Sequence, residues 1–348
     1  MEKDYLKIYD ALDRKDLREE KKRTQAMQEA GVYPKSLNFP LTLQFELTTR
    51  CNVFCKHCYN DSGEKNNARD PMTPEKWIEF SRYLVEHGGI FECILSGGEP
   101  LLLGDKLFDI MDILHDDGTS FLLITNGYLL SREKVERLAK YRYHWLQVSI
   151  DGVTPEYHDA FRRKEGSWQR AVDGAFQVSA AGIPLTIAHS VTPGNLEQVD
   201  AMCELAYELG ASSIILGEVN ISGRSAANRE IFLNNSEKAI LLKKFEENYA
   251  RYQGKMLVRR SGSTKTSVLR YLNSPNAGLI IRPNGDMRLD CMAPFVIGNV
   301  LRDDFAAVWT EKHDSCWRHP SVSAYIESFQ KDDSNSMLTN YVDSDVYI

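Results

Sequence analysis

Cysteine is scarce in this chain, long apolar runs are missing, and positive charge is not in excess. The 348 residues include seven cysteines, 42 lysines and arginines, and 49 aspartates and glutamates. The net charge of −7 argues against a nucleic-acid-binding protein, because contacts to phosphate need a basic surface. No apolar run approaches the length of a membrane span, so we expect no membrane partner.

The first residues, MEKDYLKIYDALDRKDL, carry too much charge for a secretory signal peptide, so we expect a cytoplasmic protein. In that compartment thiols stay reduced, and clustered cysteines are more often metal ligands or catalysts than disulfides. Acidic and basic residues alternate through residues 1–38, which predicts a helical extension outside the core. It is either a plain surface helix or an arm that docks a substrate or partner.

From residue 41 onward, short aliphatic runs alternate with segments of helical periodicity. Six such strand–helix units indicate an α/β fold with a parallel sheet and helices packed outside it. The sheet is either open and doubly wound or a partial barrel, and in both cases the chemistry lies at the C-terminal ends of the strands. The expected strands are Leu41–Leu47, Phe91–Leu95, Phe121–Thr125, Trp145–Ile150, Leu185–Val191 and Ser213–Val219.

After the N-terminal extension, the sequence divides into a core, a small second region and a C-terminal segment. The core spans residues 39–254, and a small second region follows at residues 255–320. In that region GLIIRPNGDMRLD predicts a hairpin that turns at Asn284–Gly285. The last segment, residues 321–348, is polar and acidic, and its composition favours disorder over a flap that covers a site.

Three of the cysteines, Cys51, Cys55 and Cys58, directly follow the first expected strand in the sequence TRCNVFCKHC. A structural zinc site usually has paired C-x2-C hooks that supply four ligands, whereas the nearest other cysteine, Cys93, lies within an expected strand. His57 is a poor fourth zinc ligand because it lies between two of the cysteines. Three thiolates on a cluster of four irons leave one iron open to bind a cofactor.

This spacing, with SGGEP after the second strand and ITNG and VSIDG at the ends of the next two, resembles the radical S-adenosylmethionine (SAM) superfamily. The resemblance covers residues 41–320 and implies a partial (β/α)6 TIM-like barrel. It also implies an enzyme with one 4Fe–4S cluster, held by Cys51, Cys55 and Cys58, with SAM on the open iron. In that family the reduced cluster cleaves SAM to a 5′-deoxyadenosyl radical that abstracts hydrogen from substrate. A flavodoxin or ferredoxin is the expected reducing partner.

The resemblance also assigns contacts to SAM. Gly97 and Gly98 allow close backbone approach at the SAM amino group, where Glu99 offers acceptors. Arg162 resembles the arginine that binds the SAM carboxylate, and Arg163 beside it is the alternative. The remaining expected contacts are His57 at the adenine, Asn126 and Ser149 at the ribose or methionine part, Asp151 on the same face as Ser149, and the backbone at Leu216 near the adenine.

The C-terminal region resembles the SPASM or twitch extension of radical SAM maturases, which modify ribosomally made peptides, redox-cofactor precursors or sulfatases. Full versions hold auxiliary iron–sulfur clusters, but only Cys291 and Cys316 remain here, so we expect no second cluster. The two cysteines are either small hydrophobic residues kept for packing, or one of them donates a hydrogen atom to a substrate radical, as a peptide epimerase requires.

We therefore expect a radical SAM enzyme that modifies a precursor peptide by crosslinking, epimerisation or another C–H modification. One alternative is the same chemistry on a small molecule, such as a sugar or a cofactor precursor. The other is a non-catalytic metal-binding scaffold, against which the retention of the three clustered cysteines with SGGEP argues.

Overall fold

The structure is a computed structural model. It describes residues 19, 22, 25, 26, 29, 30, 39–63, 70–261, 271–272, 277–331 and 345–348. Most of the expected N-terminal extension, residues 1–38, lies outside the described residues.

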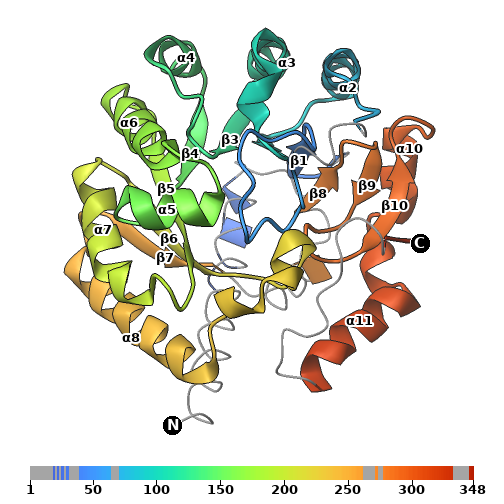
Figure 1. Ribbon diagram of the computed structural model, residues 1–348. Coiled ribbons are helices and arrows are strands. Elements are labelled where there is room, and N and C mark those ends of the chain that lie inside the picture. Colours follow the sequence, from blue (N-terminus) through green and yellow to red (C-terminus); the bar gives the residue numbers. More distant parts are fainter. Residues whose placement is uncertain are drawn as a thin grey trace.

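The first six strands form the parallel sheet that the sequence predicts. Each pairs in parallel with the strand before it, so the six lie side by side in chain order. Helices cover the outer face of this curved sheet (Figure 1). The partial-barrel fold is therefore confirmed. The strands are β1 (Thr42–Glu46), β2 (Glu92–Ser96), β3 (Ser120–Thr125), β4 (Tyr143–Ser149), β5 (Leu185–Val191) and β6 (Ser213–Glu218).

The helix that follows β1 shows how the sequence sets these elements. In α2 (Pro74–Glu86) the Thr73 side chain accepts a hydrogen bond from the Lys76 amide, and Pro74 occupies the first turn. The fully buried Trp77 packs against Phe45 of β1, with ring centroids 4.8 Å apart. The other helices before residue 255 are α3 (Asp105–Asp116), α4 (Arg132–Leu138), α5 (Pro155–Arg162), α6 (Ser167–Ala180), α7 (Val199–Glu208) and α8 (Asn235–Arg251).

Alternate side chains of β1 point to opposite faces of the sheet. Phe45 packs beneath α2, so Gln44 and Glu46 face the inside of the curve. Gln44 Nε2 donates a hydrogen bond to Ser96 Oγ of β2 (2.8 Å). Glu46, at the end of the strand, is fully buried, which places a carboxylate inside the sheet at its C-terminal edge.

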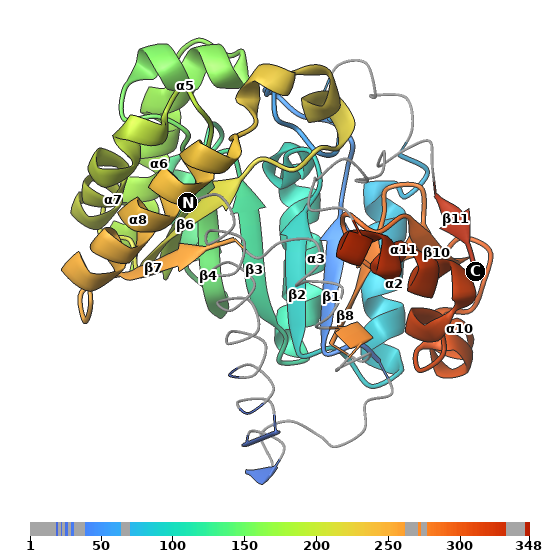
Figure 2. The ribbon, with the colours of Figure 1, turned by 90° about the horizontal axis from the view of Figure 1, so that it is seen from below.

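Later strands extend this sheet at both ends. β7 (Leu257–Arg260) is parallel to β6, and β8 (Gly278–Ile281) is parallel to β1, as Figure 2 shows for β8. β9 (Asp286–Arg288) and β10 (Phe295–Asn299) follow as antiparallel neighbours. The expected boundary at residue 254 therefore does not separate two sheets, because β7 and the hairpin pair directly with barrel strands.

The C-terminal segment is more regular than its composition indicates. α11 (Pro320–Lys331) follows α10 (Phe305–Lys312), and β11 (Val346–Tyr347) pairs in parallel with β10. The Ile348 amide donates a hydrogen bond to Val296 O (2.9 Å), and Val322 of α11 is fully buried. The expectation of disorder is wrong for these residues, because main-chain pairing and apolar burial hold them.

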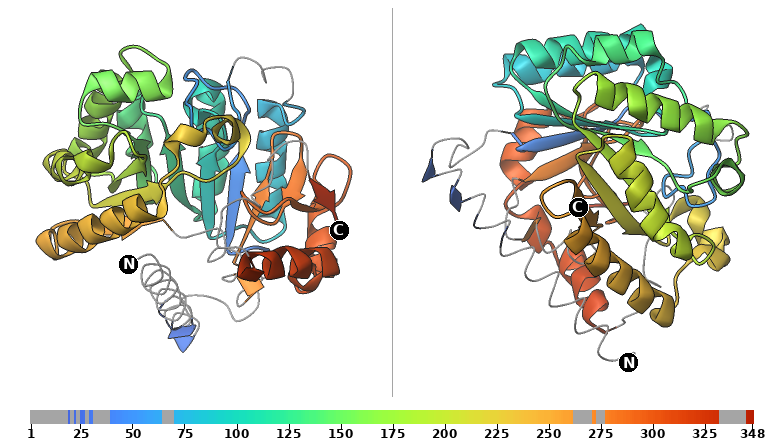
Figure 3. Two further views of the ribbon diagram at one scale, coloured as in Figure 1. Left: turned by 60° about the horizontal axis from the view of Figure 1, so that its bottom comes forward. Right: turned by 90° about the vertical axis from the view of Figure 1, so that its left-hand side faces the viewer.

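The loops that follow β1 and β6 lie at the same end of the sheet, as Figure 3 shows in blue and yellow. The Arg224 amide of the second loop donates a hydrogen bond to Cys58 O of the first (2.9 Å). The C-terminal ends of the strands thus meet where the sequence places the chemistry. Among the helices of the described residues, none combines the length and apolar character needed to cross a membrane.

Candidate functional site

The three clustered cysteines lie on the loop at residues 47–63, which we call the cysteine loop. Three other segments hold it by its backbone. The Gly98 amide donates to Thr48 O (2.6 Å), and the Phe54 amide donates to Arg162 O (3.1 Å). The guanidinium of Arg224 donates to Cys55 O (2.7 Å). The loop is therefore fixed by the SGGEP segment, the end of α5 and the loop after β6.

Sequence reasoning missed the role of Arg224. Its side chain is almost fully buried, pairs with Asp61 Oδ1 (2.6 Å) and donates to Ser62 O (2.9 Å). Its guanidinium also lies over the Phe54 ring, 3.6 Å from the centroid. The one available signal was an arginine in a glycine- and serine-containing loop directly after the last strand of the barrel core.

The sulfur atoms receive hydrogen bonds from neighbouring groups. The Ser62 amide donates to Cys58 Sγ (3.3 Å), and Asn126 Nδ2 lies 3.7 Å from Cys51 Sγ. Burial raises the pKa of the Cys51 thiol to about 12 and that of the Cys55 thiol to about 11. Metal coordination deprotonates a thiol outright, so thiolates at these buried positions are favoured only with a bound cation.

The surroundings of the cysteine loop fit a cluster and a polar cofactor. Among the described residues, no three His, Cys, Asp or Glu side chains are gathered tightly enough to hold a single metal ion. Three thiols spread along one loop suit the larger iron–sulfur cube. Beside them, three buried nitrogen atoms have no hydrogen-bond partner: Asn52 Nδ2, His57 Nδ1 and Arg162 Nε. Buried polar groups normally have partners, so these atoms mark a place for a polar ligand.

The glycines of SGGEP permit close approach, but the backbone they approach is that of the cysteine loop. A Cβ atom on Gly98 would lie 2.0 Å from Arg50 O, and one on Gly97, where φ is +125°, would lie 2.7 Å from Thr48 O. Any side chain at these positions would displace the loop that carries Cys51. The expected contact of both glycines with SAM stays a prediction.

Glu99 is fully buried and its carboxylate is bonded within the protein. It accepts hydrogen bonds from the Leu101 amide (3.1 Å), Thr125 Oγ1 (2.8 Å) and the Asn126 amide (2.9 Å). Burial raises its pKa, and these donors oppose that effect. The structure thus gives the Glu99 side chain a role in joining SGGEP to the end of β3, and its expected role as an acceptor for SAM stays a prediction.

Asp151 and Arg162 form a buried ion pair beside the cysteine loop. Arg162 Nη2 lies 2.8 Å from Asp151 Oδ2, and the Ser190 amide donates to Asp151 Oδ1 (2.8 Å). Burial is the largest single influence on Asp151 and raises its pKa, but the Arg162 guanidinium and the three neighbouring histidines together outweigh burial and lower the pKa. Arg163 has φ of +53° and is exposed, so of the two arginines only Arg162 is aimed into the site.

His57 lies between this ion pair and the cysteines. Its ring stacks on Phe161 at a centroid distance of 4.5 Å, and Nε2 is 3.9 Å from Asp151 Oδ2. Burial lowers the pKa of His57 to about 4, so the ring is neutral at pH 7. A flat neutral ring suits the predicted position beside an adenine.

The other expected SAM contacts, Asn126, Ser149 and Leu216, lie in different surroundings. Asn126 Nδ2 donates to Asn52 Oδ1 of the cysteine loop (2.8 Å), and Ser149 is half-buried at the end of β4. The Leu216 side chain is buried in the core, and its carbonyl accepts a hydrogen bond from the Ser261 amide (3.1 Å). Contacts of these residues with a cofactor stay predictions.

The two C-terminal cysteines lie in different surroundings. Cys316 is buried in the helical turn at Cys316–Arg318, and its thiol lies 3.5 Å from His313 O. Cys291 is half-buried, and the nearby Asp290 and Glu46 carboxylates add to the effect of burial in raising its pKa. Only Cys291 therefore shares its surroundings with a carboxylate from inside the barrel.

A buried ionic group that the sequence did not reveal links the barrel to the extension. Glu46 Oε1 accepts a hydrogen bond from the hydroxyl of Tyr59 (3.2 Å), which directly follows Cys58. Glu46 Oε2 lies 3.9 Å from Arg282 Nε. Asp345, near the C-terminus, pairs with both Arg282 and Arg288. Burial raises the pKa of Glu46, with Arg282 opposing that effect.

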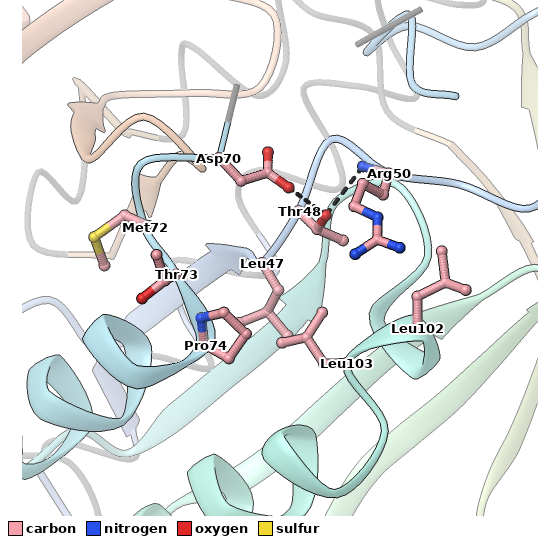
Figure 4. A pocket seen from close by; sticks show the side chains of 9 residues that line it. All are labelled: Leu47, Thr48, Arg50, Asp70, Met72, Thr73, Pro74, Leu102 and Leu103. Carbon is pink, nitrogen blue, oxygen red and sulfur yellow. Dashed lines mark hydrogen bonds between the residues drawn. The ribbon is translucent and has the colours of Figure 1, made fainter. Parts of the chain in front are cut away.

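A cavity of about 490 Å³ lies on the outer side of the cysteine loop (Figure 4). Asp70 at its wall accepts hydrogen bonds from Thr48 Oγ1 (2.5 Å) and the Thr49 amide (2.9 Å). The cavity contains none of the predicted SAM contacts. Its lining is Leu47, Thr48, Arg50, Asp70, Met72, Thr73, Pro74, Leu102 and Leu103.

Comparison with known proteins indicates the family of this chain. The Radical SAM superfamily model matches residues 45–206. Mycofactocin maturase MftC from Mycolicibacterium smegmatis is 30% identical over 302 residues, which cover 82% of this chain and 74% of that protein. PqqA peptide cyclase from Rhizobium meliloti is 27% identical, covering 79% and 74%. AdoMet-dependent heme synthase from Methanosarcina barkeri is 36% identical, covering 56% of this chain and 55% of that protein.

The fold has solved counterparts as well. Streptococcus suis SuiB, in its crystal structure bound to precursor peptide SuiA, superimposes with a TM-score of 0.64 at 14% identity. The match covers 86% of this chain and 70% of SuiB.

The chain belongs to the radical SAM superfamily. Membership implies an iron–sulfur cluster and SAM as cofactors. The chain spans only 55% of the length of the heme synthase it matches.

Proposed function

We propose that this enzyme holds a single 4Fe–4S cluster on Cys51, Cys55 and Cys58 and binds SAM beside it. The observation that carries the proposal is the fixed loop with three thiols, next to buried nitrogen atoms that have no hydrogen-bond partner among the described residues. When bound, the cluster and SAM supply a 5′-deoxyadenosyl radical that abstracts hydrogen from substrate. The protein residues position these groups and exclude water.

Individual residues take distinct roles in this proposal. Arg162 presents its free Nε to the SAM carboxylate, while Asp151 holds the guanidinium in place through Nη2. His57, neutral and stacked on Phe161, lies against the adenine. Asn126 and Ser149 bind the ribose or methionine part, with a backbone contact near Leu216. Gly97, Gly98 and Glu99 keep the segment after β2 against the cysteine loop.

The substrate we propose is a precursor peptide. Two relatives that align with about four-fifths of this chain are a peptide cyclase and a maturase. The similarity to a heme synthase supports the alternative of a small-molecule substrate, but that match covers only 56% of the chain. Cys291 is the better candidate for a hydrogen donor, because it lies near Glu46, whereas Cys316 is packed in a helical turn.

The test is iron and labile sulfide per chain after anaerobic reconstitution, together with formation of 5′-deoxyadenosine from SAM. We expect about four irons in the wild type, lost in a Cys51→Ala/Cys55→Ala/Cys58→Ala variant. Cys203→Ala is the matched control, because Cys203 is buried on α7. About eight irons, with four surviving in the triple variant, would refute the single cluster. Iron without any 5′-deoxyadenosine would favour the scaffold alternative.

The substrate class needs its own test. The reconstituted enzyme is incubated with SAM, a reductant and any short peptide encoded beside its gene. We expect a mass change in the peptide that requires SAM. If SAM is cleaved but no such peptide is altered, a small-molecule substrate becomes the better proposal.

A further inference from the structure

The outer rim of the cysteine loop is cationic although the whole chain carries a net charge of −7. Lys56 lies within the loop, and its backbone binds Phe161 O at the end of α5 (3.0 Å) and Asn228 Nδ2 (3.2 Å). These two contacts bring the segments around residues 163–170 and 228–229 to the loop. We define the rim patch as the half-buried or exposed cations on these segments: Lys56, Arg163, Lys164, Arg170 and Arg229.

Cations of the patch lie over two aromatic rings near the cysteines. Phe54, between Cys51 and Cys55, has Arg163 at 5.8 Å from its centroid. Tyr128, two residues after Asn126, has Lys164 and Arg170 each at 5.3 Å. Both rings are half-buried. Aromatic residues and arginine are enriched at the centres of protein interfaces.

Nearby acidic residues do not neutralise these cations fully. The Asp159 carboxylate accepts hydrogen bonds from backbone amides at the start of α6, including those of Gly166 (2.7 Å) and Trp168 (2.8 Å). Asp61 pairs with the buried Arg224. Glu165 and Glu230 are the exposed acids on the same segments. The segments that define the patch thus carry five half-buried or exposed cations and two exposed acids.

We propose that the rim patch is the docking surface for an acidic electron-carrier protein that reduces the cluster. This inference rests on the proposed function, since it requires a cluster on the cysteine loop. Lys56 of the patch lies between Cys55 and Cys58 in the chain, Arg163 lies over the ring of Phe54 in the cysteine loop, and α5 borders this loop in Figure 1. Complementary charge steers association and raises its rate by 10- to 1,000-fold at low salt. The carrier loses one electron and the cluster gains it, with no bond made or broken and no proton transferred.

The experiment compares two double charge reversals in reconstituted enzyme. Arg163→Glu/Arg170→Glu alters the patch at two exposed positions outside the predicted cofactor contacts. Lys140→Glu/Lys255→Glu is the control, with the same change in net charge at exposed positions just before β4 and β7, at the opposite end of the sheet. The readouts are the Kd for oxidised flavodoxin at low and high salt, and the rate of cluster reduction by reduced flavodoxin.

We expect the patch variant to weaken flavodoxin binding and slow its reduction of the cluster by about 10-fold or more at low salt, with a weaker salt dependence. The control variant keeps wild-type values. Reduction by methyl viologen, a small cationic reductant, is not slowed in either variant. A cluster that is absent, or that methyl viologen cannot reduce, would count against the proposed function. If methyl viologen reduces the cluster normally, slower reduction by flavodoxin reports on docking alone.

Three results would overturn the proposal. One is wild-type affinity of the patch variant for both flavodoxin and a poly-glutamate peptide. Another is an equal loss in both, which would reflect net charge alone. The third is unchanged flavodoxin binding with loss of affinity for a poly-glutamate peptide, which would make the patch a surface for an acidic peptide. Should the charge reversal fail to fold, Arg163→Gln/Arg170→Gln gives the same comparison with a smaller expected effect.

Discussion

Asp151 is fully buried, and one arginine and three histidines lie near it. This arrangement determines which of these side chains are charged. The Asp151 amide donates a hydrogen bond to His158 Nδ1 (3.1 Å), and His189 Nδ1 lies 3.2 Å from Ile150 O. Burial lowers the pKa of both histidines, because a charged imidazole would lose its hydration. The rings are therefore neutral, and Arg162 is the cation that faces Asp151.

His158 makes the stability of the protein dependent on pH. Burial lowers its pKa from 6.5 to about 4, so the unfolded chain binds a proton before the folded protein does. Stability is complete above pH 6.5 and falls as the pH drops toward 4. At pH 5 this histidine alone costs about 2 kcal/mol. We expect His158→Gln to reduce the loss of unfolding free energy between pH 7 and pH 5 by that amount, as measured by urea denaturation.

The control for this experiment is His87→Gln, at an exposed position at the end of α2. An equal pH dependence in the wild type and His158→Gln would show that His158 is not the group that takes up the proton.

Among the elements, the hairpin of β8 and β9 connects the barrel to the C-terminal region. The Gly285 amide donates to Arg282 O (2.8 Å), and the Arg282 amide donates to Asp286 O (3.0 Å). Gly285 has φ of +89°, a conformation that side chains rarely adopt. The turn thus depends on the Asn284–Gly285 pair that the sequence indicated.

Alanine at Gly285 tests how far this turn is restricted. The new Cβ would lie 2.7 Å from Asn299 Oδ1 and 2.9 Å from Leu301 Cγ. Gly254 offers a matched control, since its φ is +75° but no atom lies within 4 Å of the Cβ position. We expect Gly254→Ala to lower the unfolding free energy by about 1 kcal/mol and Gly285→Ala by about 3 kcal/mol. Equal losses would mean that strain at positive φ, and not crowding, limits both positions.

At the scale of the whole molecule, the C-terminal residues are joined to the sheet that contains the barrel strands. Asp345 pairs with Arg282 and Arg288, which are both almost fully buried. The hydroxyl of Tyr347 donates to Asp286 Oδ1 (3.0 Å), and Lys312 Nζ donates to Ile348 O (2.8 Å). The last four residues therefore neutralise charge inside a sheet that begins at residue 42.

Removing residues 345–348 should destabilise the protein as a whole. The deletion takes the Asp345 carboxylate away from two buried arginines, and loss of one partner of a buried ion pair costs about 3–5 kcal/mol. We expect a clear fall in Tm, and a similar fall for Asp345→Asn. Tyr347→Phe, which removes the hydroxyl that donates to both carboxylate oxygens of Asp286 from an exposed side chain, should change the unfolding free energy by about 1 kcal/mol or less. A deletion as mild as Tyr347→Phe would contradict the ionic role of Asp345.

Much of this architecture was predictable, because it depends on local patterns. The alternation of aliphatic runs with helical periodicity predicted all six barrel strands, and β5 was predicted with its bounds, Leu185–Val191. The pair Asn284–Gly285 predicted the hairpin because few turns accept other residues. The position of three cysteines after β1 predicted a site at the C-terminal edge, since parallel strands end together there.

The partners of buried polar side chains were not predictable in this way. Arg224 reaches Cys55 across 169 positions of sequence, and Asp345 reaches Arg282 across 63. Glu99 binds Thr125 and Asn126 where the motif alone suggested a ligand contact. Periodicity reports which face a residue occupies and carries no information on the distant group that it meets.

The sequence by itself determined the order of strands and helices, the hairpin turn and the cysteine loop, because backbone propensity and side-chain periodicity act over a few residues. Only the tertiary structure decided that Arg162 and not Arg163 faces the site, that Cys291 lies near Glu46, and that the C-terminus supplies a carboxylate to the barrel. The physical reason is that buried charges must find partners, and chain folding brings those partners from distant positions.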